Sequence, residues 1–73
     1  HIALRYGYLE IMECLIDKGA DINKSDNDGN TPLHIASEEY EYLEIVKFLI
    51  EKGADINKSN NYGYTPLFIA LLN

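Results

Sequence analysis

The sequence predicts an all-α solenoid of stacked antiparallel helix pairs, because three observations agree. The segment GADINKS occurs at residues 19 to 25 and again at 53 to 59, which is 34 residues later. The longer segments 9 to 36 and 43 to 70 are identical at 20 of 28 aligned positions. In both copies the apolar residues recur with helical spacing, and each apolar run ends just before a glycine. Self-similarity at this period indicates a repeat protein.

The residues at the expected helix ends suit those places. Thr31 is a good N-cap, and Pro32 fits the first helical position, where no amide partner is lost. We therefore expect a helix over residues 32 to 40. A second helix is expected over residues 43 to 52, and Gly53 then stands where a left-handed residue ends a helix without a side-chain clash.

The other copies repeat these signals. Helices are expected over residues 1 to 6, 9 to 18 and 66 to 72, with Gly19 as the counterpart of Gly53. Gly29 and Gly63 supply a permissive backbone in the turn before each Thr cap. No extended sheet is expected.

The link between the paired helices differs between the copies. The segment SEEYEY of the middle unit is one residue longer than LRYGY of the first. Glu41 therefore stands where the first unit has Gly7, and we expect it in a left-handed conformation, which costs a residue other than glycine roughly 1 kcal/mol. The turn of the middle unit should then differ from that of the first.

The helix expected over 43 to 52 is apolar around most of its circumference, with one polar stripe formed by Glu44, Lys47 and Glu51. Such a helix should be covered on more than one side; its apolar residues are Leu43, Ile45, Val46, Phe48, Leu49 and Ile50. In the first copy, Cys14 lies on the apolar face between Ile11 and Leu15, and we expect a buried, inert thiol there.

The motifs GNTPLHIA at 29 to 36, GYTPLFIA at 63 to 70 and LEIVKFLIEKGADIN at 43 to 57 closely resemble the ankyrin repeat. Tetratricopeptide repeats share the period, but their Trp-x-x-Leu-Gly pattern is missing from this sequence. The resemblance implies an ankyrin-repeat solenoid whose helix pairs are joined by β-turn fingers. One domain over residues 1 to 73 is expected, with a partial repeat at 1 to 26, a full repeat at 27 to 60 and a partial repeat at 61 to 73.

The resemblance implies a non-enzymatic module that binds a protein partner through the turn fingers and the face of the first helices. A structural spacer or regulatory arm within a larger multidomain protein is the alternative. Matched to the family's variable surface, the partner-binding residues are Arg5, Tyr6, Asp26, Asn27, Asp28, Asn30, Glu38, Glu39, Asn61, Tyr62 and Tyr64. Acidic and aromatic residues there favour a basic or polar segment of the partner. The alternative for Tyr62 and Tyr64 is that they only shield the neighbouring turn.

Composition argues against other partners. The net charge is −6, with 12 acidic and 6 basic residues, so nucleic acid and anionic membranes are not expected partners. One cysteine cannot form an internal disulfide, and we expect a reducing intracellular compartment, the cytoplasm. The glycosylation-type sequons at Asn23 and Asn57 occupy equivalent positions, and we interpret them as duplicated loop residues.

Neither a catalytic centre nor a cofactor is expected. His34 in the resembled motif bonds the Thr hydroxyl and nearby backbone, and no nucleophile, base and orienting residue can be assembled around it. His1, Cys14 and His34 share no zinc-ligand spacing. The run DINKSDNDGN resembles a calcium loop, but Asp26 stands where that loop needs Gly and Pro32 where it needs Glu.

The two ends of the sequence lack polar capping repeats. His1 aligns with His34, so the first unit has no turn or Thr cap, and the last unit has no second helix before Asn73. We expect a piece of a longer array whose open ends associate with each other.

Overall fold

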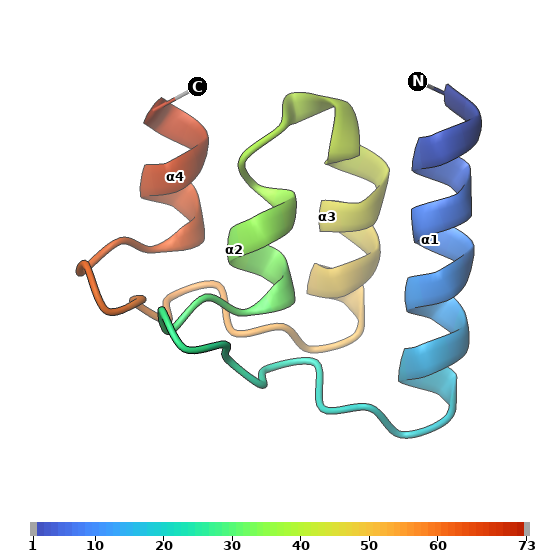
Figure 1. Cartoon of the computed structure of the whole chain (residues 1–73), viewed down its shortest axis with the longest axis horizontal. Helices are drawn as coiled ribbons and strands as arrows, with labels where there is room; N and C mark the ends of the chain where they lie inside the picture. The colour runs from blue at the N-terminus through green and yellow to red at the C-terminus, as the bar shows by residue number, and fades with distance from the viewer. Residues whose placement is uncertain (1, 73) are drawn as a thin grey trace.

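The computed structural model describes residues 2 to 72, with the side chains of residues 2 to 5 and 40 outside that description. The chain forms helices and turns, and no strand occurs between residues 2 and 72, as predicted (Figure 1). The elements in order are α1 (Ile2–Asp17), α2 (Pro32–Ala36), the 3-10 helix η1 (Tyr40–Tyr42), α3 (Leu43–Glu51) and α4 (Pro66–Leu72). Two long loops, residues 18–31 and 52–65, run along the same end of the helices (Figure 1).

The core lies between α2 and α3, which form an antiparallel pair joined through η1 (Figure 1). Leu33 and Ala36 of α2 meet Ile45 and Leu49 of α3, and Leu49 is fully buried. Full burial of such a leucine contributes about 1.5 to 3 kcal/mol to folding, so this pair is the centre of stability. Helix α1 packs on α3, and α4 packs on α2.

The two glycines at the helix ends have the predicted backbone. Gly19 follows α1 with φ of 96°, and Gly53 follows α3 with φ of 99°. The amide of Ala20 donates to the carbonyl of Leu15 at 3.0 Å, and the equivalent bond closes α3. These bonds pair carbonyls that a helix end would otherwise leave without partners.

The prediction of separate helices over 1 to 6 and 9 to 18 is wrong, because α1 is continuous from Ile2 to Asp17. Gly7 lies inside it without a positive φ. A continuous helix keeps its backbone groups paired, whereas a break would leave amides and carbonyls needing new partners.

The middle unit also differs from the prediction. Helix α2 ends at Ala36 rather than at residue 40, and the hydroxyl of Ser37 donates to the carbonyl of Leu33 at 2.7 Å. Glu41 is part of η1 and is not left-handed, because positive φ among residues 2 to 72 is confined to glycines. The extra residue is therefore accommodated in a tight helical turn rather than in a strained conformation.

Two expectations about burial are also wrong. Cys14 is exposed, and helix α3 is covered less completely than its apolar sequence predicts, with Leu43 and Ile50 about half exposed. The reason is geometric: α3 has α2 on one side and α1 on another, and its remaining surface faces solvent. On the polar stripe, Lys47 and Glu44 form an ion pair at 3.7 Å. Between residues 2 and 72, none of the helices has the length and apolar character needed to cross a bilayer.

Candidate protein-binding surface

The tips of the two loops form matching turns, here called the first finger (residues 26–30) and the second finger (residues 60–64). In the first finger, Asp26 Oδ1 accepts hydrogen bonds from the amides of Asp28 at 2.9 Å and Asn30 at 3.0 Å. Asn60 Oδ1 accepts the two corresponding bonds in the second finger. Each finger is therefore held by its first side chain, which is why short polar residues begin it.

Hydrogen bonds join the two fingers side by side. The amide of Asn61 donates to the carbonyl of Asp28 at 2.9 Å, and Asn61 Nδ2 donates to the carbonyl of Asn27 at 2.9 Å. The Nδ2 of Asn60 donates to Asn30 Oδ1 at 2.8 Å. Binding residues on one finger thus keep a defined position relative to those on the other.

The two finger tyrosines differ in exposure. Tyr62 is 67% exposed at the tip, whereas Tyr64 is 38% exposed. The centroid of the Tyr64 ring lies 4.8 Å from the ring centroid of Phe68 on α4 and 6.2 Å from that of Tyr62. Tyr64 therefore supports the base of the finger, and Tyr62 is the tyrosine left free for contacts.

His34 has the structural role expected of it. Its Nδ1 accepts from the backbone amide of Thr31 at 3.0 Å and lies 2.8 Å from the Thr31 hydroxyl. Because Nδ1 accepts, Nε2 carries the proton and donates to the carbonyl of Tyr64 at 3.0 Å. The ring is fully buried and both nitrogens have partners, so it is not available as a base.

The remaining predicted residues do not join the fingers. Glu38 and Glu39 are exposed beyond the end of α2 that lies away from both fingers (Figure 1). Tyr6 is exposed on α1, and Arg5 is part of the same helix, although its side chain lies outside the description. The structure thus separates these four predicted residues from the finger cluster.

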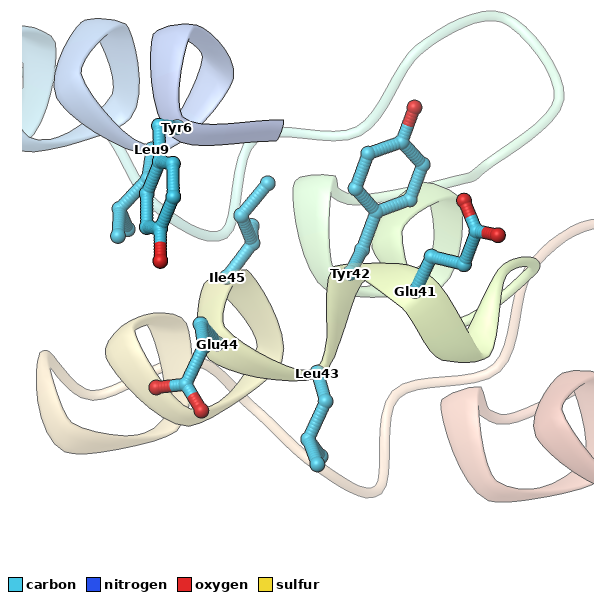
Figure 2. A pocket seen from close by; sticks show the side chains of 7 residues that line it. All are labelled: Tyr6, Leu9, Glu41, Tyr42, Leu43, Glu44 and Ile45. Carbon is cyan, nitrogen blue, oxygen red and sulfur yellow. The ribbon is translucent and has the colours of Figure 1, made fainter. Parts of the chain in front are cut away.

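Tyr6 borders a small hollow between α1 and the η1–α3 segment, shown in Figure 2. Its other lining residues are Leu9, Glu41, Tyr42, Leu43, Glu44 and Ile45. The hollow has a volume of about 210 Å³, which is below the roughly 300 Å³ at which ligand pockets begin. It is better suited to one side chain of a partner than to a small molecule.

A larger apolar groove between α1 and α2 was not predicted from the sequence. It is lined by Tyr8, Ile11, Met12, Pro32, Ile35, Ala36, Tyr42 and Ile45. The sequence predicted a separate helix over residues 1 to 6, and the continuity of α1 changes which neighbours its apolar residues meet. The lining comes from four elements, α1, α2, η1 and α3, and the sequence alone carries no signal that places them around one groove.

Asn23 is a second feature that sequence reasoning missed. Its Nδ2 donates to the carbonyl of Gly53 at 3.4 Å, and its Oδ1 accepts from the amide of Asp55 at 2.7 Å. Lys58 Nζ donates to the carbonyl of Asn23 at 3.4 Å. The exact duplication of GADINKS was a signal that this segment has a structural contact to preserve.

Chemically, the surface offers acidic and carboxamide groups. Asp28, Glu38 and Glu39 are exposed carboxylates. Among residues 2 to 72, no three His, Cys, Asp or Glu side chains are grouped so as to hold a metal ion. The arrangement can bind complementary polar groups and one or more aromatic or aliphatic side chains.

Comparison with known proteins gives a consistent result. A family model described as "Ankyrin repeats (3 copies)" matches residues 1–73. Human Rabankyrin-5 is 42% identical over 36 residues, which cover 49% of this chain and 3% of the relative. Mouse protein phosphatase 1 regulatory subunit 12A is 49% identical over 37 residues, which cover 51% of this chain and 4% of the relative. The NF-kappa-B inhibitor cactus of Drosophila melanogaster is 46% identical over 39 residues, which cover 52% of this chain and 8% of the relative. The chain thus corresponds to a small part of each relative.

Proposed function

Because the chain belongs to the ankyrin repeat family, we propose that it is a non-enzymatic module that binds a protein partner through its fingers. Ankyrin repeats are generally protein–protein interaction modules. One relative is named an inhibitor of NF-kappa-B and another a regulatory subunit of protein phosphatase 1. Those roles belong to the relatives, and for this chain we propose only that it binds a protein partner without catalysing a reaction.

The observation that carries the proposal is the rigid pair of fingers with an exposed tyrosine at its tip. Three hydrogen bonds join the fingers, so little conformational freedom remains to be lost when a partner binds. Tyr62 offers a large amphipathic ring at low entropic cost. It is the proposed anchor, whereas Tyr64 positions it.

The proposed partner segment is basic or polar. Asp28 presents an exposed carboxylate on the first finger, and its carbonyl accepts from Asn61 of the second. Asp26, Asn27, Asn30 and Asn61 supply the polar frame. Glu38, Glu39, Arg5 and Tyr6 form the more distant part of the proposed surface. Opposite charge on a partner would speed its association, and the aromatic contact would slow its dissociation.

The test is a binding measurement with an identified partner and four variants. Tyr62→Ala should weaken binding by about 2 kcal/mol, mainly through faster dissociation. The isosteric Asp28→Asn, and Glu38→Lys with Glu39→Lys, should slow association most at low salt. The matched control is Glu51→Gln on the polar stripe of α3, which should change neither rate.

The opposite pattern would assign the partner to the other face. If the Tyr62 and acidic variants bind normally while Glu44→Lys or Glu51→Lys abolishes binding, the finger surface is not the site. If no partner depends on either face, the chain acts as a structural spacer or regulatory arm of a larger protein, the alternative function.

We further propose a reducing intracellular compartment, the cytoplasm, because the only cysteine of the chain, Cys14, is a free and exposed thiol. Such thiols persist where glutathione and thioredoxin keep them reduced. Microscopy of the tagged full-length protein in its own cells tests this location.

A second proposal is that copies of the chain associate end to end. Leu67, Leu71 and Leu72 on α4 are between 60% and 73% exposed, and Ile11 and Leu15 on α1 are more than half exposed. Burial of such residues is the main driving force for association. Sedimentation velocity over a range of concentrations tests it, and a mass that grows with concentration is expected.

A further inference from the structure

We infer that the hollow between α1 and the η1–α3 segment binds one arginine side chain of a protein partner (Figure 2). This inference rests on the proposed function, that the chain binds a protein, and it adds a second contact site with a stated side chain. The η1 turn lies at the end of the helices away from both loops (Figure 1). The arginine therefore belongs to a different part of the partner from the segment that would contact the fingers.

The two walls of the hollow are elements that pack on each other. Tyr6 and Leu9 are three residues apart on α1, so they share a face of that helix. Tyr42 and Ile45 form the other wall, where η1 continues into α3 (Figure 2). Ile45 is only 5% exposed and Leu9 packs against the core, so the deepest part of the hollow is apolar. The aliphatic stem of a long side chain can be covered there while its polar end stays near the surface.

The charged side chains described around the hollow, Glu41 and Glu44, are both acidic and exposed. Glu41 already interacts within the chain, so the pairing with a partner is assigned to Glu44. The Glu44 carboxylate lies 3.7 Å from Lys47 Nζ, but the side chains of Glu44 and Lys47 are 70% and 59% exposed. An exposed pair of this kind contributes little to stability, so a cation seated in the hollow can replace Lys47. The hollow is therefore suited to a cationic side chain and would repel an acidic one.

Two tyrosines give the hollow an aromatic surface. Tyr6 is 61% exposed, so its ring is accessible to a partner. The centroid of the Tyr42 ring lies 5.9 Å from that of Tyr8, and this contact holds Tyr42 in place. A cation over the face of such a ring is attracted by the negative charge of its π-electrons. An apolar floor, an aromatic wall and a carboxylate thus meet in one hollow.

Arginine matches this combination better than lysine does. Its guanidinium is planar and weakly hydrated, so it can stack on a tyrosine ring and hydrogen-bond a carboxylate at the same time. The ammonium of lysine is strongly hydrated and gains less at a site that stays open to water. The volume of about 210 Å³ leaves room for one side chain rather than for a larger ligand.

The position of the hollow also limits which partners can use it. Because the fingers and the η1 turn lie at opposite ends of the helices, a partner that contacts both must extend along the helices (Figure 1). Two weak contacts on one partner bind more tightly together than either does alone, because the second contact forms at a high effective concentration. The hollow should therefore strengthen binding only of partners whose arginine is placed to reach it.

The test is an NMR titration of the isotope-labelled chain with a blocked Gly-Arg-Gly tripeptide. We expect saturable binding with a dissociation constant on the order of 1 to 10 mM, and shift changes confined to the backbone amides of residues 6–9 and 41–45. The same peptide with citrulline keeps the shape of arginine but has no charge, and it should bind about fivefold more weakly or worse. The lysine peptide should also bind more weakly than the arginine peptide.

Variants of the chain identify the groups that bind. Glu44→Gln removes the charge but keeps the size, and it should raise the dissociation constant of the arginine peptide about threefold to fivefold. Tyr6→Leu removes the ring and should raise it about twofold to fivefold. The matched control is Glu51→Gln on the same helix but outside the hollow, which should leave the dissociation constant unchanged. Circular dichroism and the unfolding midpoint check that all three variants remain folded.

The outcomes separate this inference from the proposed function. Equal binding of the citrulline peptide, or an unchanged dissociation constant for Glu44→Gln, would overturn the charge pairing and with it the inference. A lysine peptide that binds as well as the arginine peptide would overturn the choice of arginine. Absence of saturable shifts around the hollow would overturn the second site but leave the proposed function intact, because the finger variants are measured with the protein partner. Arginine-dependent binding together with finger variants that have no effect would support the hollow and count against the fingers.

Discussion

The Nε2 atom of His34 lies 3.0 Å from the carbonyl oxygen of Tyr64, thirty residues later in the chain. The Nδ1 atom of the same ring accepts a hydrogen bond from the amide of Thr31 at the start of α2. One buried side chain therefore caps the N-terminus of the helix that carries it and also hydrogen-bonds that helix to the second finger. The finger pair, and with it the proposed binding surface, depends on this contact.

Replacing this ring should destabilise the protein even if its size is kept. His34→Phe leaves the buried amide of Thr31 and the carbonyl of Tyr64 without the imidazole nitrogens that hydrogen-bond them. The free energy of unfolding should therefore fall by about 1 to 3 kcal/mol. The natural control is Phe68→His at the equivalent, more exposed position, where the change should stay within about 0.5 kcal/mol. Urea unfolding monitored by circular dichroism measures both, and equal effects of the two variants would contradict the role given to His34.

The Thr31 cap offers a second test of the contacts at the N-terminus of α2. Thr31→Ala removes the side-chain oxygen that accepts from the His34 amide, and the free energy of unfolding should fall by about 1 kcal/mol. Thr65→Ala removes the equivalent cap of α4, where the Thr65 oxygen accepts from the amide of Phe68 at 3.2 Å. Because Thr31 also bonds the His34 ring, its loss should cost more. An unchanged unfolding midpoint for Thr31→Ala would contradict this account.

The close approach of the fingers can be tested at a matched pair of glycines. Gly29 and Gly63 have φ of 79° and 81°, so an alanine at either position is strained by roughly 1 kcal/mol. A Cβ on Gly29 would also lie 2.7 Å from the backbone nitrogen of Asn61, whereas a Cβ on Gly63 meets nothing within 4 Å. Gly29→Ala should therefore be clearly more destabilising in thermal unfolding. If the two variants unfold at the same temperature, the fingers are not in contact.

The exposed thiol gives a prediction that opposes the sequence-based one. Cys14 was expected to be buried, but the structure exposes it on α1. A thiol-reactive probe should therefore modify it completely in the folded protein, at a rate close to that in urea. Slow labelling that requires unfolding would show that the outer face of α1 is covered in solution, as association through that face would also do.

The features that could be predicted from sequence are those decided within a few residues. Thr31 and Gly19 were identified because a cap and a left-handed helix end depend on their own chemistry and on the next turn of the chain. The role of His34 came from the resemblance. The family model and the all-helical structure confirm that resemblance and the fold class it implied.

The features that could not be predicted depend on neighbours that a single sequence does not place. The environment of Cys14 follows from which sides of α1 are packed, and the spatial separation of Glu38 from the fingers follows from the direction of α2. The bridging role of Asn23 requires knowing that the two loops lie side by side. Duplication indicated that the segment mattered without showing what it contacts.

The continuity of α1 can be tested by the same substitution at two glycines. Gly7 lies inside the helix, and a Cβ added there would meet nothing within 4 Å. Gly7→Ala should therefore stabilise the protein by about 0.5 to 1 kcal/mol, because glycine loses more backbone entropy in a helix than alanine. Gly19 also has free space, but its φ is 96°, and Gly19→Ala should destabilise by about 1 kcal/mol. Chemical denaturation of both variants gives the two signs directly. If Gly7→Ala is destabilising like Gly19→Ala, residue 7 has a left-handed backbone, and the first copy contains two helices rather than one.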